Sequence, residues 1–252
     1  MQHRQTDLSD AGRALLRIFT HIYVINLPER TDRRREVEQQ LNRFGLSLDH
    51  PAVTLVPASR PADRGEFPNV GARGCFESHL ITLRAALDAG HQHFLILEDD
   101  ADFSDDLDSR LDALSEAAQG LDWDIFYGWL PGGDAGGQAA ALQEIPAQTG
   151  VVMSHFVGIN GRILPDLIPY MAAIYSRPLG DPQGGAMHVD GAYSWFRAAH
   201  PQCLTIAPVR SISVQRSSRS DIHPLRWFDR IPVLAPIVGS LRRVRASLRK
   251  RL

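Results

Sequence analysis

The stretch Phe94-Leu-Ile-Leu-Glu-Asp-Asp-Ala-Asp-Phe103 decides the fold class and the place where we look for chemistry. Its first four residues are apolar, which predicts a buried strand, and three carboxylates follow immediately. Open α/β sheets bind ligands at the carboxyl ends of their strands. Carboxylates this close repel one another, and a bound divalent cation would relieve the repulsion. The alternative is a solvated acidic turn that caps a helix over residues 104–119.

The direction of these acidic side chains depends on where the strand ends. If the strand continues, its period of two places Glu98, Asp100 and Asp102 on one side and Asp99 on the other. If the strand breaks after Leu97, this assignment no longer applies.

Strand and helix patterns alternate along the rest of the chain, outward from this stretch in both directions. Apolar runs predict strands over residues 21–27, 53–56, 123–129, 151–159, 204–207 and 212–215. Helical spacing predicts helices over residues 30–44, 78–89, 165–175 and 190–199. Residues 57–74 are rich in Gly, Pro and charge and are predicted to form a long loop. The alternation predicts an α/β fold with a mostly parallel central sheet.

Charge divides the chain into an acidic body and a basic tail. The 252 residues hold 27 basic and 29 acidic residues, but residues 223–252 hold eight of the basic ones and a single acid. We therefore predict a leader (1–20), one domain (21–222) and a tail (223–252). An acidic body argues against nucleic-acid binding.

The tail pattern predicts a basic amphipathic helix. Leu241, Val244, Leu248 and Leu252 recur at helical spacing among basic residues, a pattern that suits an anionic membrane surface. A tail packed on its own body, or a disordered one, is the alternative. Residues 1–10 lack the apolar core of a signal peptide. We expect a cytoplasmic protein, peripheral on the inner face of the cytoplasmic membrane, in which Cys75 and Cys203 are reduced thiols, with their pairing left open.

Missing motifs exclude several metal and phosphate chemistries. Lys250 is the only lysine, and no P-loop, HExxH, CxxC, GxSxG or GxGxxG motif occurs. A phosphorelay receiver would need an Asp between Asp134 and Asp166 and a later Lys in the body. What remains is a nucleotide diphosphate held by a metal, as glycosyl transfer from a nucleotide sugar requires. Glu98 and Asp100 supply the acid-x-acid pair for that metal.

Five ordered motifs carry a family resemblance over residues 21–222. They are YVINL (23–27) with Arg30, Asp32, Arg33 and Arg34; GCFESH (74–79) with Leu80; LEDDA (97–101); Val189-Asp190; and QRSSRSDI (215–222). In this order they resemble glycosyltransferase family 25, the lipooligosaccharide-type galactosyltransferases related to collagen galactosyltransferases. Pro28 and Phe156 depart from the family pattern.

The resemblance implies a GT-A-like fold, a UDP-sugar donor (most often UDP-galactose), Mn²⁺ or Mg²⁺, and inversion at the anomeric carbon. It implies a lipooligosaccharide, LPS or other surface glycan as acceptor. The residues expected to bind the nucleotide sugar are Asn26, Leu27, Arg30, Arg33, Arg34, Ser78, His79, Glu98 and Asp99, with Asp100 and Glu98 on the metal. Ser78 and His79 are expected to begin a helix whose amino end favours an anion. Each arginine could instead belong to a solvated helix face, and His79 could be structural.

Asp190 is the candidate general base for the acceptor hydroxyl, with His188 and Asp221 as rivals. An ordinary helix N-cap is the alternative role of Asp190. Gln215, Ser220 and Asp221 are candidate acceptor-binding residues. Two competing functions remain: a catalytically silent glycan-binding or glycan-assembly protein of the same fold, and a nucleotidyltransferase, which the lack of lysines in the body disfavours.

Overall fold

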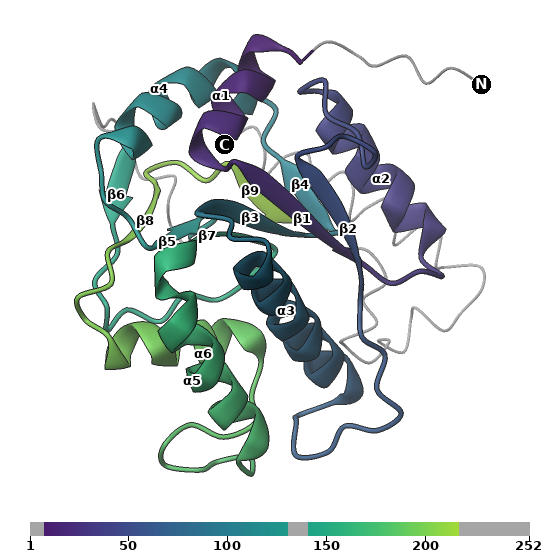
Figure 1. Ribbon diagram of the computed structural model, residues 1–252, viewed down its shortest axis with the longest axis vertical. Coiled ribbons are helices and arrows are strands. Elements are labelled where there is room, and N and C mark those ends of the chain that lie inside the picture. Colours follow the sequence, from purple (N-terminus) through teal and green to yellow (C-terminus); the bar gives the residue numbers. More distant parts are fainter. Residues whose placement is uncertain (1–7, 131–140, 217–252) are drawn as a thin grey trace, which may run out of the picture.

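A seven-stranded sheet forms the centre of the protein in a computed structural model that describes residues 8–130 and 141–216 (Figure 1). Its strand order is β2-β1-β3-β7-β5-β8-β6. The strands are β1 (His21–Asn26), β2 (Val53–Pro57), β3 (His93–Glu98), β5 (Ile125–Tyr127), β6 (Leu142–Glu144), β7 (Phe156–Asn160) and β8 (Thr205–Pro208). Strands β1, β2, β3, β5 and β8 run in one direction, and β7 and β6 run against them. The predicted α/β class with a mostly parallel sheet is confirmed.

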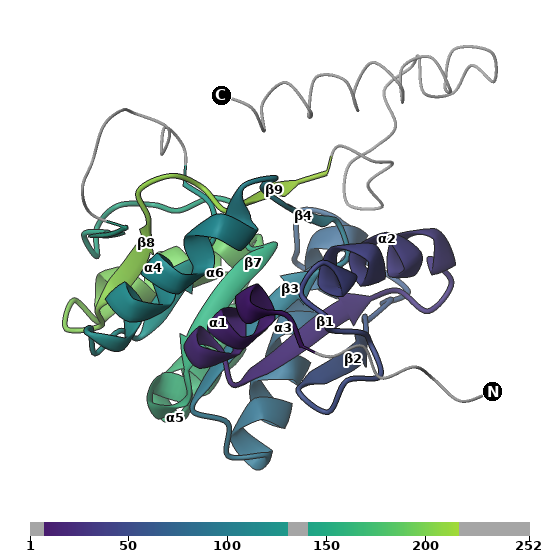
Figure 2. The same ribbon diagram turned by 90° about the horizontal axis from the view of Figure 1, so that it is seen from above.

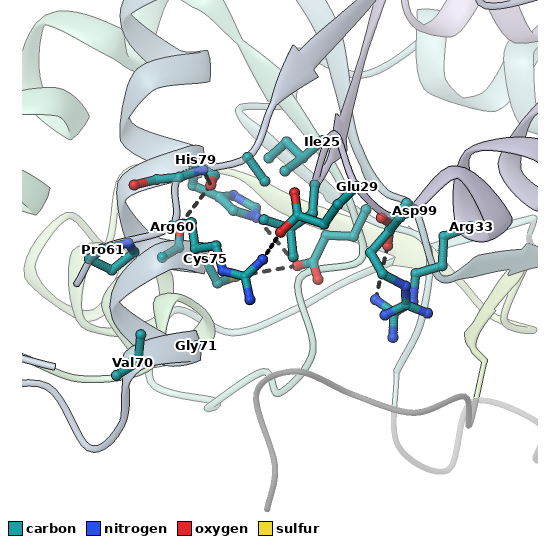
Figure 3. A pocket seen from close by; sticks show the side chains of 17 residues that line it. Ile25, Glu29, Arg33, Arg60, Pro61, Val70, Gly71, Cys75, His79 and Asp99 are labelled. Atoms are coloured by element: carbon teal, nitrogen blue, oxygen red, sulfur yellow. Dashed lines mark hydrogen bonds and ion pairs between the residues drawn. The ribbon is translucent and has the colours of Figure 1, made fainter. Parts of the chain in front are cut away.

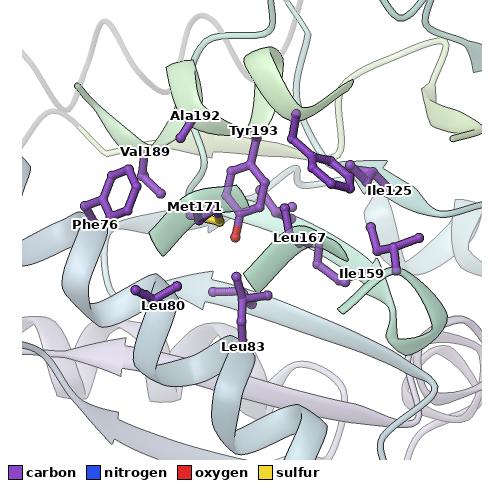
Figure 4. Packing of buried hydrophobic residues seen from close by; sticks show 14 of the residues in the cluster. Phe76, Leu80, Leu83, Ile125, Ile159, Leu167, Met171, Val189, Ala192 and Tyr193 are labelled. Carbon is purple, nitrogen blue, oxygen red and sulfur yellow. The ribbon is translucent and has the colours of Figure 1, made fainter. Parts of the chain in front are cut away.

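Helices cover both faces of the sheet (Figures 1 and 2). Helices α1 (Asp10–Ile18), α2 (Thr31–Asn42) and α4 (Leu107–Gln119) pack on one face. Helices α3 (Val70–Asp88), α5 (Leu164–Ser176) and α6 (Val189–Ala199) pack on the other, and a short 3₁₀ turn (Gly161–Ile163) precedes α5. Figure 4 shows the second cluster, where residues of α3, α5 and α6 meet the sheet.

The buried strands β1 and β3 contribute to both clusters because successive side chains alternate between the faces. In β3, Leu95 and Leu97 face α1, α2 and α4, whereas Phe94 and Ile96 face α3. This is why both strands read as continuous apolar runs rather than as alternating patterns.

The N-terminal leader of the predicted division includes α1. Ala14 and Leu15 of this helix are fully buried, and α1 packs against α4. Of the described helices, none combines the length and the hydropathy that a membrane crossing requires. The predicted amphipathic helix of the tail lies outside the described residues, and the domain limits at residues 21 and 222 remain predictions.

Helix α3 begins earlier than predicted, and this corrects the expected position of two site residues. It starts at Val70 with Asn69 as its N-cap, so Ser78 and His79 lie in the middle of the helix rather than at its amino end. Gly74 suggested a loop, but it is needed for packing: a Cβ here would lie 2.7 Å from the carbonyl oxygen of Ser59. The glycine allows the helix to approach the 58–61 segment closely.

The acidic stretch is not one continuous strand. Strand β3 ends at Glu98, Asp99 and Asp100 form a turn, and β4 (Ala101–Phe103) pairs with β9 (Ser213–Gln215) in a separate two-stranded sheet. The alternation from Glu98 to Asp102 therefore does not apply. The helix predicted over residues 104–119 starts later than expected, at Leu107 (α4), and the hydroxyl of Ser104 is buried without a hydrogen-bond partner.

Candidate functional site

The carboxyl ends of β1 and β3 meet at one edge of the sheet and position the acidic turn. The two strands are parallel, and Ile25 lies in register with Glu98. The next residues are also joined, because the Asn26 side-chain amide donates to Asp99 Oδ2 at 2.7 Å. The sequence predicted this edge as the place of the site, and the structure puts Glu98 and Asp99 beside a cavity there.

The cavity has a volume of about 380 Å³ and lies between this edge and the amino-terminal half of α3 (Figure 3). Acidic and basic side chains line it together: Glu29, Arg30, Arg33, Arg60, Glu98 and Asp99. The remaining lining residues are Ile25, Leu27, Ala58, Ser59, Pro61, Val70, Gly71, Gly74, Cys75, Ser78 and His79. Arg60 forms an ion pair with Glu29, which joins the 58–61 segment to the end of β1. Seven of the nine residues predicted to bind the nucleotide sugar therefore line one pocket.

The Glu98 carboxylate contacts side chains from α3 and from the segment before β7. Its Oε1 accepts a hydrogen bond from Ser154 Oγ at 2.8 Å and lies 3.3 Å from His79 Nε2. Burial opposes ionisation of this carboxyl, but the contacts with His79 and Ser154 outweigh it and hold its pKa below the ordinary value. Glu98 is therefore an anion on the pocket wall.

Asp99 forms a buried ion pair with Arg33. Arg33 Nη1 lies 3.0 Å from Asp99 Oδ1, and both side chains are about nine-tenths buried. Burial raises the pKa of Asp99, against the opposing effects of Arg33 and Asn26. Asn26 itself does not line the pocket, so it contributes by orienting Asp99.

Asp100 does not line the pocket, and its negative charge is offset by long contacts. It is 5% exposed, accepts long hydrogen bonds of 3.3 and 3.4 Å from Gln215 Nε2, and lies 3.6 Å from Arg33 Nη1. Burial and the charge of Glu98 raise its pKa. Carboxylate oxygens are the ligands that Mg²⁺ and Mn²⁺ prefer, and Glu98 and Asp100 supply them from positions two residues apart, although of the two only Glu98 lines the pocket.

Of three other predicted residues, Arg30 and Ser78 line the pocket and Arg34 does not. Arg34 is exposed and does not line the pocket, which fits a solvated helix face. Arg30 lines the pocket and pairs with Asp32 at 2.8 Å. The Ser78 hydroxyl donates to the Gly74 carbonyl and accepts from the Ser59 amide, so it fixes the 58–61 segment on α3.

Asp190 lies in the first turn of α6, and the segment before β7 connects it to Glu98, the acid at the end of β3. Its Oδ2 accepts a hydrogen bond from the Met153 amide at 3.0 Å, while the next residue, Ser154, contacts Glu98. Met153 has a φ of 70°, a strained value for a residue with a side chain. The charges of Glu98, Asp100 and Asp190 all raise the pKa of the Cys75 thiol, after burial. Of these three acids, Glu98 lines the pocket, and Asp100 and Asp190 do not.

Sequence reasoning missed several residues of the site. Cys75 and Ser154 contact Glu98, and the Tyr193 hydroxyl lies 3.1 Å from His79 Nδ1. Cys75 and His79 are four residues apart, and a helix prediction beginning at residue 70 would have placed them on one face. Nothing local to Ser154 or Tyr193 indicates a role. Both cysteines are free thiols. Ser220 and Asp221, predicted to bind acceptor, lie outside the described residues.

Comparison with known proteins gives partial sequence matches. The chain is 29% identical over 125 residues to a "Glycosyltransferase 25 family member" of Anopheles gambiae, covering 43% of this chain and 21% of that protein. It is also 29% identical over 127 residues to "Procollagen galactosyltransferase 1" of Danio rerio, with the same coverages. The match thus spans about a fifth of the length of these relatives. No protein-family model matches the chain.

Two solved structures are also similar. A glycosyltransferase involved in the glycosylation of the major capsid of PBCV-1 gives a TM-score of 0.36 at 12% identity, covering 75% of this chain and 92% of that one. A197 from STIV gives a TM-score of 0.38 at 13% identity, covering 82% and 99%. Both TM-scores lie below 0.5, so these two structures add nothing to the sequence matches. It is the two sequence relatives that confirm the resemblance of this chain to glycosyltransferase family 25.

Proposed function

We propose that this chain is a glycosyltransferase that moves a hexose, with galactose as the first candidate, from a UDP-sugar to a surface glycan such as lipooligosaccharide or LPS. The observation that carries the proposal is the pocket at the carboxyl ends of β1 and β3. It combines Glu98 and Asp99 with Arg30, Arg33 and Arg60, the charge pattern that a nucleotide diphosphate with a cation requires. The family names of the sequence relatives support it.

Glu98 and Asp100 are the residues that would hold a divalent cation, Mn²⁺ or Mg²⁺. When bound, the cation would supply positive charge to the diphosphate leaving group. Asn26 and Arg33 hold Asp99 in place beside this pair. Arg30 and Arg33 line the pocket on the α2 side, where their guanidinium groups suit phosphate oxygens. Leu27 and the backbone at the end of β1 offer the surface for the uridine.

Inverting transfer needs a base for the acceptor hydroxyl, and Asp190 is our candidate. The acceptor oxygen attacks the anomeric carbon, the bond to the diphosphate breaks, and the hydroxyl proton moves to the base. Two contacts support this role: the Met153 and Gly191 amides donate to the Asp190 carboxylate, and Ser154, next to Met153, contacts Glu98. Asp190 itself is not among the residues that line the pocket. Asp190→Asn should lower kcat strongly while leaving the Kd of UDP unchanged; an equal loss of UDP affinity would contradict the assignment. His188, the residue before α6, is the rival to test next.

The proposal is tested by calorimetric titration of UDP and by UDP-sugar hydrolysis, each with and without Mn²⁺. Asp100→Asn should abolish the metal-dependent part of both signals, because it removes one of the two buried carboxylates. Asp105→Asn is the matched control, since this acid is exposed and its side chain is remote from the described contacts of the pocket. Failure of UDP to bind with any divalent cation would refute the proposal. Binding without hydrolysis or transfer would favour the catalytically silent glycan-binding alternative.

The acceptor side and location of the protein complete the proposal. Gln215 contacts Asp100, which supports its proposed role on the acceptor side. Ser220 and Asp221, the other two proposed acceptor residues, lie outside the described residues. A lipid-linked acceptor would suit a cytoplasmic enzyme whose basic residues 223–252 dock on the inner membrane face. Sedimentation with anionic liposomes, full-length protein against residues 1–225, tests this; equal binding by both would remove the idea.

A further inference from the structure

Cys75, His79 and Glu98 place three different metal-ligating atoms at one point of the pocket wall. The Cys75 sulfur, the His79 ring nitrogen and a Glu98 carboxylate oxygen all lie within 4.8 Å of one another. Cys75 and His79 come from successive turns of α3, and Glu98 is the last residue of β3. All three residues line the cavity.

Two distances within this cluster come close to those around a tetrahedral ion, and the third, between Cys75 and His79, is within 4.8 Å. His79 Nε2 lies 3.3 Å and Cys75 Sγ 3.9 Å from the same oxygen, Glu98 Oε1. Zinc binds nitrogen, oxygen and sulfur at about 2.0–2.3 Å, so tetrahedral ligands stand roughly 3.3–3.8 Å apart. To bind such an ion, the Cys75 sulfur and the Glu98 oxygen would move a few tenths of an ångström closer together. The Cys75 sulfur and the His79 ring nitrogen would also move toward each other.

Neighbouring side chains orient the His79 imidazole and the Glu98 carboxylate for metal binding. His79 is fully buried, and the Tyr193 hydroxyl lies 3.1 Å from its Nδ1, which fixes the ring so that Nε2 points at Glu98. Ligand histidines in metal sites have this kind of partner on their other nitrogen. Ser154 orients Glu98 in the same way, by a hydrogen bond of 2.8 Å.

We propose that Cys75, His79 and Glu98 form a binding site for a thiophilic divalent cation of the zinc class, with its fourth position open to the pocket. Sulfur and imidazole ligands favour Zn²⁺ and Co²⁺ over Mg²⁺ and Mn²⁺, which prefer oxygen. The ion displaces the thiol proton of Cys75 to solvent and binds a neutral His79 through an unprotonated Nε2, with the ring proton on Nδ1 facing the Tyr193 hydroxyl. It takes a water molecule or a ligand oxygen as its fourth partner.

The site shares Glu98 with the acid pair that we propose for Mn²⁺ or Mg²⁺. A thiophilic ion would therefore compete with the hard cation and inhibit transfer. This consequence rests on the proposed function, whereas binding of the thiophilic ion does not.

Cobalt titration of the full-length protein tests the site without any nucleotide or activity. Because the chain holds two cysteines, a thiolate-to-cobalt charge-transfer band can arise only from Cys75 or Cys203. We expect one equivalent of Co²⁺ to give this band in the wild type and in Cys203→Ser, and Zn²⁺ to remove it. Cys75→Ser should lose the band and bind Zn²⁺ at least about tenfold more weakly. Absence of the band in the folded wild type, or its survival in Cys75→Ser, would overturn the proposal.

A second measurement covers the case in which Cys75→Ser does not fold. Zn²⁺ should protect Cys75 of the wild-type protein from alkylation, while alkylation of Cys203 stays unchanged, as mapped by mass spectrometry. Equal alkylation of Cys75 with and without Zn²⁺ would refute the site. Neither readout depends on UDP, so a failed transferase assay and a failed metal site are told apart.

Discussion

Replacing the buried Arg197 of α6 by methionine should destabilise the fold and loosen the segment that leads to the site. Arg197 is fully buried, and no carboxylate of the described residues pairs with it. Its guanidinium donates instead to four neutral oxygens: Thr205 Oγ1 and the carbonyls of Ile145, Pro146 and Thr149, at 2.8–3.2 Å. Three of these bonds attach residues 145–149 to α6, and the fourth attaches β8 to it.

The magnitude follows from those four bonds. Each net hydrogen bond contributes about 1 kcal/mol to the free energy of unfolding. Methionine keeps much of the side-chain volume and removes the cost of burying a charge, which offsets part of the loss. The lowered pKa of Arg197, caused by burial, points to the same cost. We expect Arg197→Met to lose about 3 kcal/mol, or roughly 6–12 °C in Tm for a chain of this size.

Equilibrium urea unfolding, followed by circular dichroism and tryptophan fluorescence, measures this loss. Arg84→Met, an exposed arginine on α3, is the matched control and should change the free energy of unfolding by less than about 0.5 kcal/mol. Arg197→Lys should fall between the two, because one ammonium cannot reach all four oxygens. A loss for Arg197→Met as small as that of the control would refute the reasoning that these buried bonds hold the segment.

Two further predictions concern pH and packing. Burial and the nearby His91 lower the pKa of His21 to about 4 in the folded protein, below its ordinary value of 6.5. The unfolded chain therefore takes up a proton at His21 first as the pH falls, so the free energy of unfolding decreases between pH 6.5 and pH 4 and is unaffected by His21 above about pH 6.5. His21→Gln should remove up to about 2 kcal/mol of this loss at pH 5, measured as urea midpoints at pH 7.5 and 5; identical pH slopes in both proteins would contradict it. Gly74→Ala should destabilise by about 1–3 kcal/mol and weaken UDP binding, because its Cβ would meet the Ser59 carbonyl at 2.7 Å. Gly150→Ala, whose Cβ would meet nothing within 4 Å, is its control, and equal effects of the two would show that packing at residue 74 is not limiting.

The sequence alone was enough to predict the sheet edge at which the pocket lies. Strands β1 and β3 are buried on both faces, so they appear as unbroken apolar runs, and their ends are marked by Asn26 and by the Glu98–Asp100 acids. Parallel strands bring their carboxyl ends together, and this physical rule needs no contact information. The class of fold and this edge could be found in this way. The nine residues expected to bind the nucleotide sugar followed from the family resemblance, and seven of them line the pocket.

Tertiary structure decided which side chains meet at that edge. Nothing in the local sequence predicts that β7 runs antiparallel beside β3 and delivers Ser154 to Glu98, or that Tyr193 of α6 reaches His79. Gly74 is a further example, since the close approach to the Ser59 carbonyl that favours glycine here joins segments that are apart in the sequence. Such pairings depend on long-range packing, whose energy is shared by residues far apart in sequence, whereas strand and helix periodicity is a property of neighbours.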